Sequence, residues 1–402
     1  MSQRKRVVFH IGAPKTGTTY LQTLFSRHCD DLRAVGVDYP YAEDPVVIET
    51  GACVGNVVRM VFVEGLVTRE AQRDGFPVMS RIWNERVVDL IAQVVEKSPF
   101  NTVLFSSEAM SGIGREVLLQ IRSRLLKHYD CDFVLFVRDH YDHFSSAWRQ
   151  LLKSRYLQAD FETYVQRVIQ DGRPSQGIFT PLINYSEAGV PLKVLNYDSF
   201  KDRLASELMS VVGIPLDQEA WAAERSSDIF NRSLSPSEAC IQLMVNQRFA
   251  GTHFPAFVCA RMLSRPPSGG AHEKTYDPVI DARLIEHFGG WIEKANQGIH
   301  GQPLRTRLRE GEELPAARSV DVADLECLLD ALRLAHERRT RRRPLLAELV
   351  HRWKCLMRPN VPYDFDPDAY LDMHGDVARA EADPYAHYSR NGYLEGRHYR
   401  YF

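Results

Sequence analysis

Residues Phe9–Thr19 read FHIGAPKTGTT and are the most informative segment of the sequence. Its apolar start belongs to a buried-strand pattern over Arg6–Gly12 (RVVFHIG), and the spacing that follows predicts a helix from Thr18 to about Cys29. Gly12 and Gly17 permit tight backbone geometry between the strand and the helix. A strand, a glycine turn and a helix N-terminus with free N–H groups have the parts of an anion-binding site.

The side chains of the same stretch suit a phosphate group. Lys15 adds a mobile positive charge, and Thr16, Thr18 and Thr19 add hydroxyl donors. The stretch is not a Walker A loop, because that motif has its lysine after the second glycine whereas Lys15 precedes Gly17. We predict that residues 15–19 bind the phosphate of a ligand, with a purely structural turn as the alternative.

Short apolar runs alternate with helical patterns along the first 300 residues. Further strands are predicted at Thr102–Ser106, Cys131–Val137 and Leu192–Tyr197, and helices near 80–97, 115–128 and 142–155. Strands separated by helices are typical of βαβ units and of a parallel sheet covered on both faces. The predicted fold class is therefore α/β, with a P-loop-like parallel sheet flanked by helices.

A second basic residue follows the strand predicted at Cys131–Val137. Arg138 comes directly after that strand, and Ser146 follows eight positions later in the next helix. Ligands of open α/β sheets bind outside the carboxyl ends of the strands. We therefore expect Arg138 and Ser146 to lie at the same sheet edge as the loop that contains Lys15.

At these two points the chain resembles the PAPS-dependent sulfotransferases, over roughly residues 5–250. Lys15–Thr19 is similar to their 5′-phosphosulfate loop, in the HIG-x-x-KTGTT form of bacterial members, and Arg138 with Ser146 is similar to their 3′-phosphate pair. The resemblance implies that the donor is 3′-phosphoadenylyl sulfate (PAPS) and that a sulfuryl group passes to a hydroxyl or amine. In such a transfer Lys15 would neutralise the leaving phosphate oxygen, and no metal would be required.

Glu108 is the predicted general base, because it follows the strand at Thr102–Ser106 and partial burial would raise its pKa. Capping of the following turn is the alternative role. The cytosolic small-molecule sulfotransferases have a histidine in the corresponding region and the glycan-directed members a glutamate, so the resemblance favours a carbohydrate acceptor. His10, His140 and His143 are rival bases; we expect a core role for the first and a surface or helix-entry position for the other two.

The composition sets the broad class of the protein. Its 402 residues include 50 Lys+Arg and 52 Asp+Glu, for a net charge of -2, which argues against a dedicated nucleic-acid binder. No apolar run approaches the roughly 18 residues of a membrane span, and the basic N-terminus lacks the apolar region of a signal peptide. We expect a cytoplasmic protein without a transmembrane segment. The cysteines lack zinc-site spacing, so no metal is expected.

Composition changes near residue 300. We predict a sulfotransferase-like α/β domain over 1–300, a charged helical linker over 301–357 and a small helical module over 358–402. The linker contains an arginine run, Arg338–Arg343, which is either a solvated helix end or a docking site for an anionic partner such as a polyanionic glycan or the inner membrane leaflet.

Two Asp-Pro pairs, Asp366-Pro367 and Asp383-Pro384, are each expected to open a short helix in the C-terminal module. Together with Gly392–Arg397 (GYLEGR) they resemble a small module at the ends of bacterial proteins concerned with glycans. The expected acceptor is a glycan or another component of the cell envelope, and the sequence does not show the role of the module.

Two other functions remain open at this stage. An atypical P-loop kinase would have its lysine after the second glycine and a Mg²⁺-holding Asp at a strand end, and neither appears in the expected place. A non-catalytic nucleotide- or glycan-binding protein is the other alternative, and the intact set of Lys15, Thr18, Arg138 and Ser146 argues against it.

Overall fold

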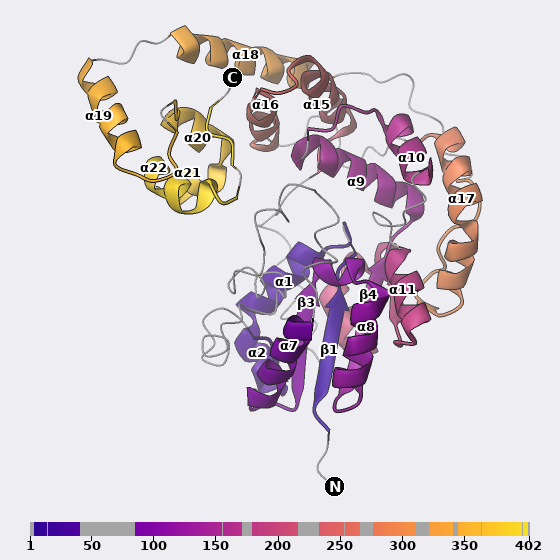
Figure 1. The fold of residues 1–402 in the computed structure, drawn as a ribbon. Coiled ribbons are helices and arrows are strands. Elements are labelled where there is room, and N and C mark those ends of the chain that lie inside the picture. The colour runs from indigo at the N-terminus through magenta and orange to yellow at the C-terminus, as the bar shows by residue number, and fades with distance from the viewer. Residues whose placement is uncertain are drawn as a thin grey trace. The chain divides into compact units, whose positions relative to one another are not determined.

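The computed structural model (Figure 1) describes residues 4–13, 15–40, 85–154, 156–170, 179–215, 233–252, 254–265, 276–309, 321–340, 345–362, 364–395 and 397–400. Contacts divide the chain into two compact units. Unit 1 comprises residues 1–147, 165–231 and 278–309, and unit 2 comprises residues 148–164, 232–277 and 310–402. The boundaries near 300 and 357 stay predictions, and the contacts group residues 232–277 with the C-terminal part of the chain.

Unit 1 is built on a sheet whose described strands all pair in parallel, in the order β2-β3-β1-β4-β5-β6. The strands are β1 (Arg6–Ile11), β2 (Val37–Asp38), β3 (Thr102–Ser107), β4 (Asp130–Val137), β5 (Lys193–Asn196) and β6 (Ile299–His300). This topology confirms the predicted α/β class with a parallel sheet flanked by helices. The strands β2 and β6 were not predicted, because two residues are too short for an apolar run.

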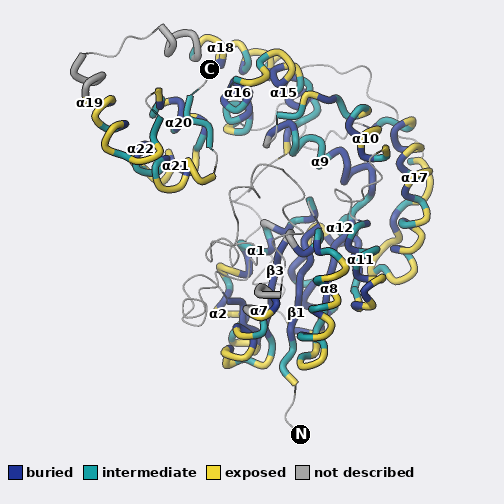
Figure 2. The backbone as a smooth tube through the Cα atoms, viewed as in Figure 1, coloured by how far each residue is buried: buried dark blue, intermediate teal, exposed yellow. Residues whose placement is uncertain are grey.

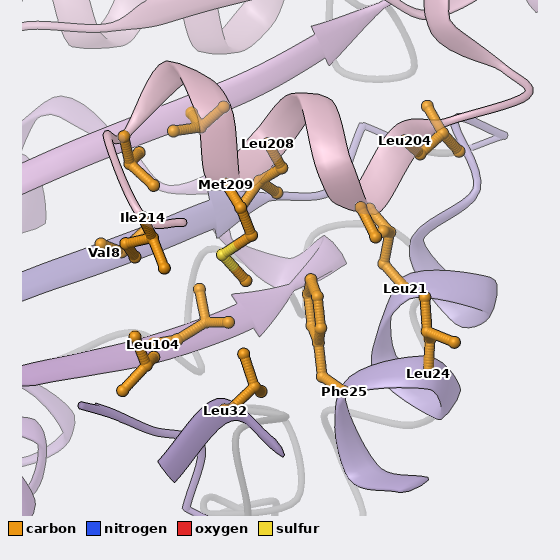
Figure 3. Close-up of a cluster of buried hydrophobic side chains, with 14 of the residues drawn as sticks. Val8, Leu21, Leu24, Phe25, Leu32, Leu104, Leu204, Leu208, Met209 and Ile214 are labelled. Carbon is orange, nitrogen blue, oxygen red and sulfur yellow. The ribbon is translucent and has the colours of Figure 1, made fainter. Parts of the chain in front are cut away.

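One face of the sheet packs against α1 (Thr18–Arg27), α2 (Cys29–Ala34) and α13 (Leu204–Val211). Figure 3 shows the buried cluster between them, in which Val8 of β1 and Leu104 of β3 meet side chains of the helices such as Phe25 and Leu208. Each fully buried side chain of this size contributes about 1.5–3 kcal/mol. This cluster fixes the start of α1, and with it the loop after β1, against the sheet.

The opposite face carries aromatic residues from three neighbouring strands. The Phe9 ring centre lies 5.6 Å from that of Phe105 and 4.8 Å from that of Phe133, because the parallel register aligns the three residues. Helices α7 (Glu85–Lys97), α8 (Arg115–Ile121) and α11 (Thr180–Ala188) cover this face. The central strands are buried on both faces, as Figure 2 shows, and therefore read as continuous apolar runs.

The remaining elements of this part of the described chain belong to unit 1 or have residues in both units. Unit 1 also contains η1 (Glu108–Gly112), η2 (Arg122–Leu126), α12 (Tyr197–Phe200) and α17 (Pro278–Asn296). Helices α9 (His140–Ser154) and α10 (Phe161–Gln170) each have residues in both units.

The described part of unit 2 consists of helices. They are α15 (Pro236–Arg248), α16 (Phe254–Leu263), α18 (Val322–Thr340), α19 (Leu345–Leu356), α20 (Pro367–Met373), α21 (Gly375–Arg379), α22 (Pro384–His387) and the turn η5 (Tyr388–Gly392). Helix α15 begins at a capping box, because the Ser235 side chain accepts from the Glu238 amide and the Glu238 carboxylate accepts from the Ser235 amide. None of the described helices has the length and apolarity needed to cross a membrane.

The two Asp-Pro pairs of the C-terminal module open helices as predicted. Asp366 accepts hydrogen bonds from the amides at the start of α20, and Asp383 accepts one from the amide of Ala386 in α22. The prolines occupy the first helical turn, where their missing N–H group leaves no donor unpaired.

The module has an aromatic core but is not separate from the rest of unit 2. Phe365, Tyr370, Tyr385 and Tyr388 pack together in a cluster of their own. Two further α20 residues, Ala369 and Met373, belong instead to the cluster that α15, α16 and α18 form. Helix α20 therefore connects the two cores of unit 2.

Candidate functional site

The loop after β1 depends on its two glycines. A Cβ atom on Gly12 would lie 2.4 Å from the hydroxyl oxygen of Thr18, so only glycine lets that side chain lie against the backbone. Lys15 and Gly17 have positive φ angles of 68° and 78°. For Lys15 this left-handed conformation is strained, by roughly 1–3 kcal/mol, and such strain concentrates at functional sites. The Thr16 hydroxyl donates a 2.6 Å hydrogen bond to a carbonyl oxygen of the same loop, which braces it.

The N-terminus of α1 carries hydrogen-bond donors without a side-chain cap. The helix has ten residues, and its N-cap residue, Gly17, makes no side-chain cap hydrogen bond. Thr18 in the first turn is buried, and its hydroxyl oxygen has no hydrogen-bond partner among the described residues. This end of the helix is suited to bind an anion, through its uncapped amides, the helix dipole, the Thr18 hydroxyl and the nearby Lys15.

Arg138 follows β4 directly at the carboxyl edge of the sheet, as predicted. Its Nε atom is buried and makes no hydrogen bond with a described residue, and the Asp198 carboxylate lies 3.7 Å from it. Asp198 accepts a 2.9 Å hydrogen bond from the Asp139 amide instead. The guanidinium is therefore held beside an acid without a direct hydrogen bond from Nε.

Tyr197 connects Arg138 with the loop after β1. The Arg138 guanidinium lies 5.4 Å from the centre of the Tyr197 ring, a cation–π contact. A Cβ atom on Gly17 would lie 3.5 Å from Cε2 of the same ring. Burial raises the pKa of Tyr197, although the charge of Arg138 acts in the opposite direction. Tyr197 was not predicted as a site residue, and its only signal in the sequence is its position at the end of the strand predicted at Leu192–Tyr197.

The other predicted site residues, Ser146, Glu108 and Thr19, are less closely connected to Arg138 and to the loop after β1. Ser146 is half-buried in the second turn of α9, in the same unit as Arg138. Glu108 directly follows β3 as the first residue of η1, at the same sheet edge. The side chains of Glu108 and Thr19 lie outside the described part of the structure.

His10 is a buried residue of the sheet core, in line with the role expected for it. Its Nδ1 atom lies 2.8 Å from the hydroxyl oxygen of Ser106, and its ring packs edge-on against Phe136. Burial lowers the pKa of His10 to about 3, so the imidazole is neutral at physiological pH. A buried imidazole with such a low pKa is a poor general base for an acceptor that enters from solvent.

The expectation that His140 and His143 lie at the surface is wrong. Both are in the first turn of α9, as a helix entry requires, but both side chains are fully buried. His140 Nε2 lies 2.9 Å from a carboxylate oxygen of Asp281 in α17, which is itself fully buried. This contact with a residue 141 positions away buries the helix entry, and local sequence gives no sign of it.

A group of ion pairs, the Asp139 network, surrounds the residue that follows Arg138. It consists of the carboxylates of Asp139, Asp142 and Asp281 and the guanidinium groups of Arg305 and Arg309. Burial alone would lower the pKa of Arg309, but the hydrogen bonds and charges of Asp142 and Asp139 raise it overall. Both arginines fall within the range predicted as a charged linker, and both belong to unit 1.

Among the described residues, no group of three or more His, Cys, Asp or Glu side chains is arranged to hold a metal ion. Comparison with protein-family models and with curated proteins found no match for this chain.

Proposed function

We propose that this protein is a sulfotransferase that moves a sulfuryl group from PAPS to a hydroxyl or amine of an acceptor. The observation that carries the proposal is the position of one ring, that of Tyr197, which contacts Arg138 and lies beside Gly17 at the start of α1. Two cationic anion-binding groups at one sheet edge suit a nucleotide with phosphate groups at two separate positions. PAPS has a 5′-phosphosulfate and a 3′-phosphate.

The roles of the residues follow from this pairing. The α1 amides, Thr18 and Lys15 would bind the 5′-phosphosulfate, and Arg138 with Ser146 would bind the 3′-phosphate. The acceptor oxygen or nitrogen forms a bond to sulfur while the bond from sulfur to the bridging phosphate oxygen breaks. The electron pair of that bond leaves with 3′,5′-ADP, whose new charge Lys15 neutralises.

The acceptor proton needs a base, and Glu108 is the proposed one. Its backbone follows β3 at the edge where β1 and β4 also end. A carboxylate beside the anionic sulfuryl group is unfavourable unless it takes the acceptor proton or pairs with a cation. A glycan or another cell-envelope component as acceptor, and a cytoplasmic location, complete the proposal.

Isothermal titration with three nucleotides tests the proposal. We expect 3′,5′-ADP to bind tighter than 5′-AMP, and ATP with Mg²⁺ to bind weakest. Arg138→Ala should weaken 3′,5′-ADP by about 10²-fold and leave 5′-AMP nearly unchanged, because the lost charge-assisted contact is to the 3′-phosphate. The matched control is Arg124→Ala, which removes an arginine of η2 whose ion pair is with Asp89 of α7.

Two results would contradict the proposal. Equal losses for 3′,5′-ADP and 5′-AMP in Arg138→Ala would show that Arg138 does not recognise the 3′-phosphate. Preferred binding of ATP with Mg²⁺ would favour the kinase alternative.

A further inference from the structure

Asp139, the residue next to Arg138, is held by two arginines that lie far from it in the sequence. The Asp139 carboxylate accepts a 3.1 Å hydrogen bond from Arg305 and a 3.0 Å hydrogen bond from Arg309, which lie 166 and 170 positions further along the chain. Both arginines follow β6, the edge strand of the sheet. The loop after β6 is thereby tied to the loop after β4.

Each of these arginines also donates to a second carboxylate. Arg305 donates to both oxygens of Asp281, at 2.6 and 3.0 Å, and Arg309 donates to Asp142 at 2.8 Å. Their side chains are only 20% and 11% exposed. Three carboxylates thus surround two guanidinium groups, and the Asp139 network has no surplus positive charge to offer a phosphate.

Arg138 is in the opposite situation. Its only ion pair in the described structure is the 3.7 Å contact with Asp198, and its buried Nε atom makes no hydrogen bond there. Of the three arginines around the end of β4, Arg138 is therefore the one that makes no hydrogen bond to a carboxylate in the described structure.

Asp139 also fixes the start of α9. Its carboxylate accepts a 3.2 Å hydrogen bond from the amide of Asp142, in the first turn of the helix that carries Ser146. Its own amide donates to Asp198, the ion-pair partner of Arg138. The position of Asp139 thus determines how the end of β4 and the start of α9 are oriented.

From this arrangement we propose that Arg305 and Arg309 are positioning residues, which orient Arg138 and Ser146 for the 3′-phosphate by holding Asp139 and do not contact the phosphate themselves. The inference rests on the proposed function. Its physical basis is preorganisation: a binding arginine held on a rigid loop loses less conformational entropy when the ligand binds.

A double-mutant cycle tests the inference, with isothermal titration of 3′,5′-ADP and 5′-AMP. Arg309→Gln is the preferred variant, because Arg305→Gln would leave the fully buried Asp281 without its guanidinium partner and would endanger the fold. We expect Arg309→Gln to weaken 3′,5′-ADP about tenfold with little change for 5′-AMP. In an Arg138→Ala background the same substitution should have no further effect on 3′,5′-ADP, because its effect passes through Arg138.

Two further variants and a measurement of hydrogen exchange test whether Arg309 acts by positioning Arg138. Arg309→Lys, which keeps the charge, should recover part of the lost affinity, and Arg124→Gln should behave as the wild type. Hydrogen exchange requires no ligand: amides of residues 138–143 should exchange faster in Arg309→Gln, whereas those of β3 should not change. Hydrogen exchange also applies if the folded Arg309→Gln protein binds 3′,5′-ADP too weakly for titration.

The outcomes separate the inference from the proposed function. Equal losses from Arg309→Gln with and without Arg138 would mean that Arg309 contacts the phosphate, and would overturn the inference. Unchanged affinity and unchanged exchange in Arg309→Gln would overturn it as well, while the proposed function would stand. If the wild type fails to prefer 3′,5′-ADP over 5′-AMP, the proposed function and the inference fall together.

Discussion

The Tyr197 ring lies against the Arg138 guanidinium, with 5.4 Å between the central guanidinium carbon and the ring centre. The same ring borders Gly17, at the start of α1. One side chain from the end of β5 therefore sets the relation between a loop after β1 and a loop after β4.

Removal of the Tyr197 ring should weaken nucleotide binding. Tyr197→Leu loses the cation–π contact, worth about 0.5–2 kcal/mol, so we expect 3′,5′-ADP to bind about 3- to 30-fold more weakly. Tyr197→Phe keeps the ring and should stay within about twofold of the wild type, a margin well under 1 kcal/mol. Titration of both variants with 3′,5′-ADP measures this effect. Equal affinities of the Tyr197→Leu and Tyr197→Phe proteins would rule out a role for the ring.

Lys15→Ala should largely abolish sulfuryl transfer while the fold survives. The loss of one preorganised cation at the leaving group reduces turnover by about 10²–10³-fold. The measurement is transfer from radiolabelled PAPS to an extract of the native cell envelope. Lys127→Ala, an exposed lysine before β4, is the control. A folded Lys15→Ala protein with more than half of the wild-type turnover would refute this role.

Glu108→Gln should reduce turnover by roughly 10²–10⁴-fold, the usual contribution of a general base, with donor affinity nearly unchanged. Gln keeps the size and hydrogen bonding of the side chain and removes its basicity, so the variant separates catalysis from turn capping. The same transfer assay applies, with Glu116→Gln, at an exposed position in α8, as the matched control. Wild-type turnover in Glu108→Gln would mean that the base lies elsewhere.

His10 should make the fold sensitive to acid. Burial lowers its pKa to about 3 from an ordinary value of 6.5, so below pH 6.5 the unfolded state binds more protons than the folded state. Stability therefore falls as the pH falls through this window, by about 2 kcal/mol between pH 7 and pH 5 for this group.

Urea unfolding at pH 7 and pH 5 measures this contribution. His10→Asn should reduce the difference in unfolding free energy between the two pH values by about 2 kcal/mol, even if it is less stable than the wild type at pH 7. His287→Asn, at an exposed position on α17, should leave the pH dependence as it is. An undiminished pH dependence in His10→Asn would show that His10 does not carry it.

Deletion of residues from 358 onward should leave 3′,5′-ADP binding intact, because the loop at Lys15 and Arg138 belong to unit 1. The deletion also removes Ala369 and Met373 from the core of α15, α16 and α18, so unit 2 should lose stability. Met373→Ala, which leaves the module in place, should cost about 2 kcal/mol. Titration and thermal unfolding measure the two effects, and loss of binding in a folded truncated protein would contradict the expectation.

The elements that could be predicted from the sequence are those whose signals are local. Strands β1, β3, β4 and β5 are apolar runs between turns, and the helices at Thr18, Pro367 and Pro384 follow recognisable turn and cap residues. Because parallel strands end at one edge, the sequence also predicted that the Lys15 loop and Arg138 share that edge. These features depend on residues within one or two turns of each other.

Which side chains meet at that edge could not be predicted, because it depends on contacts between distant parts of the chain. Tyr197 reaches Arg138 from another strand, Arg305 reaches Asp139 across 166 positions, and His140 is buried by Asp281 of α17. Such contacts have no periodicity along the chain, and an arginine that pairs with distant carboxylates has the same local sequence as one in a solvated loop. Packing of the loops after β4, β5 and β6 against one another is what distinguishes the two, and that packing exists only once the sheet has formed.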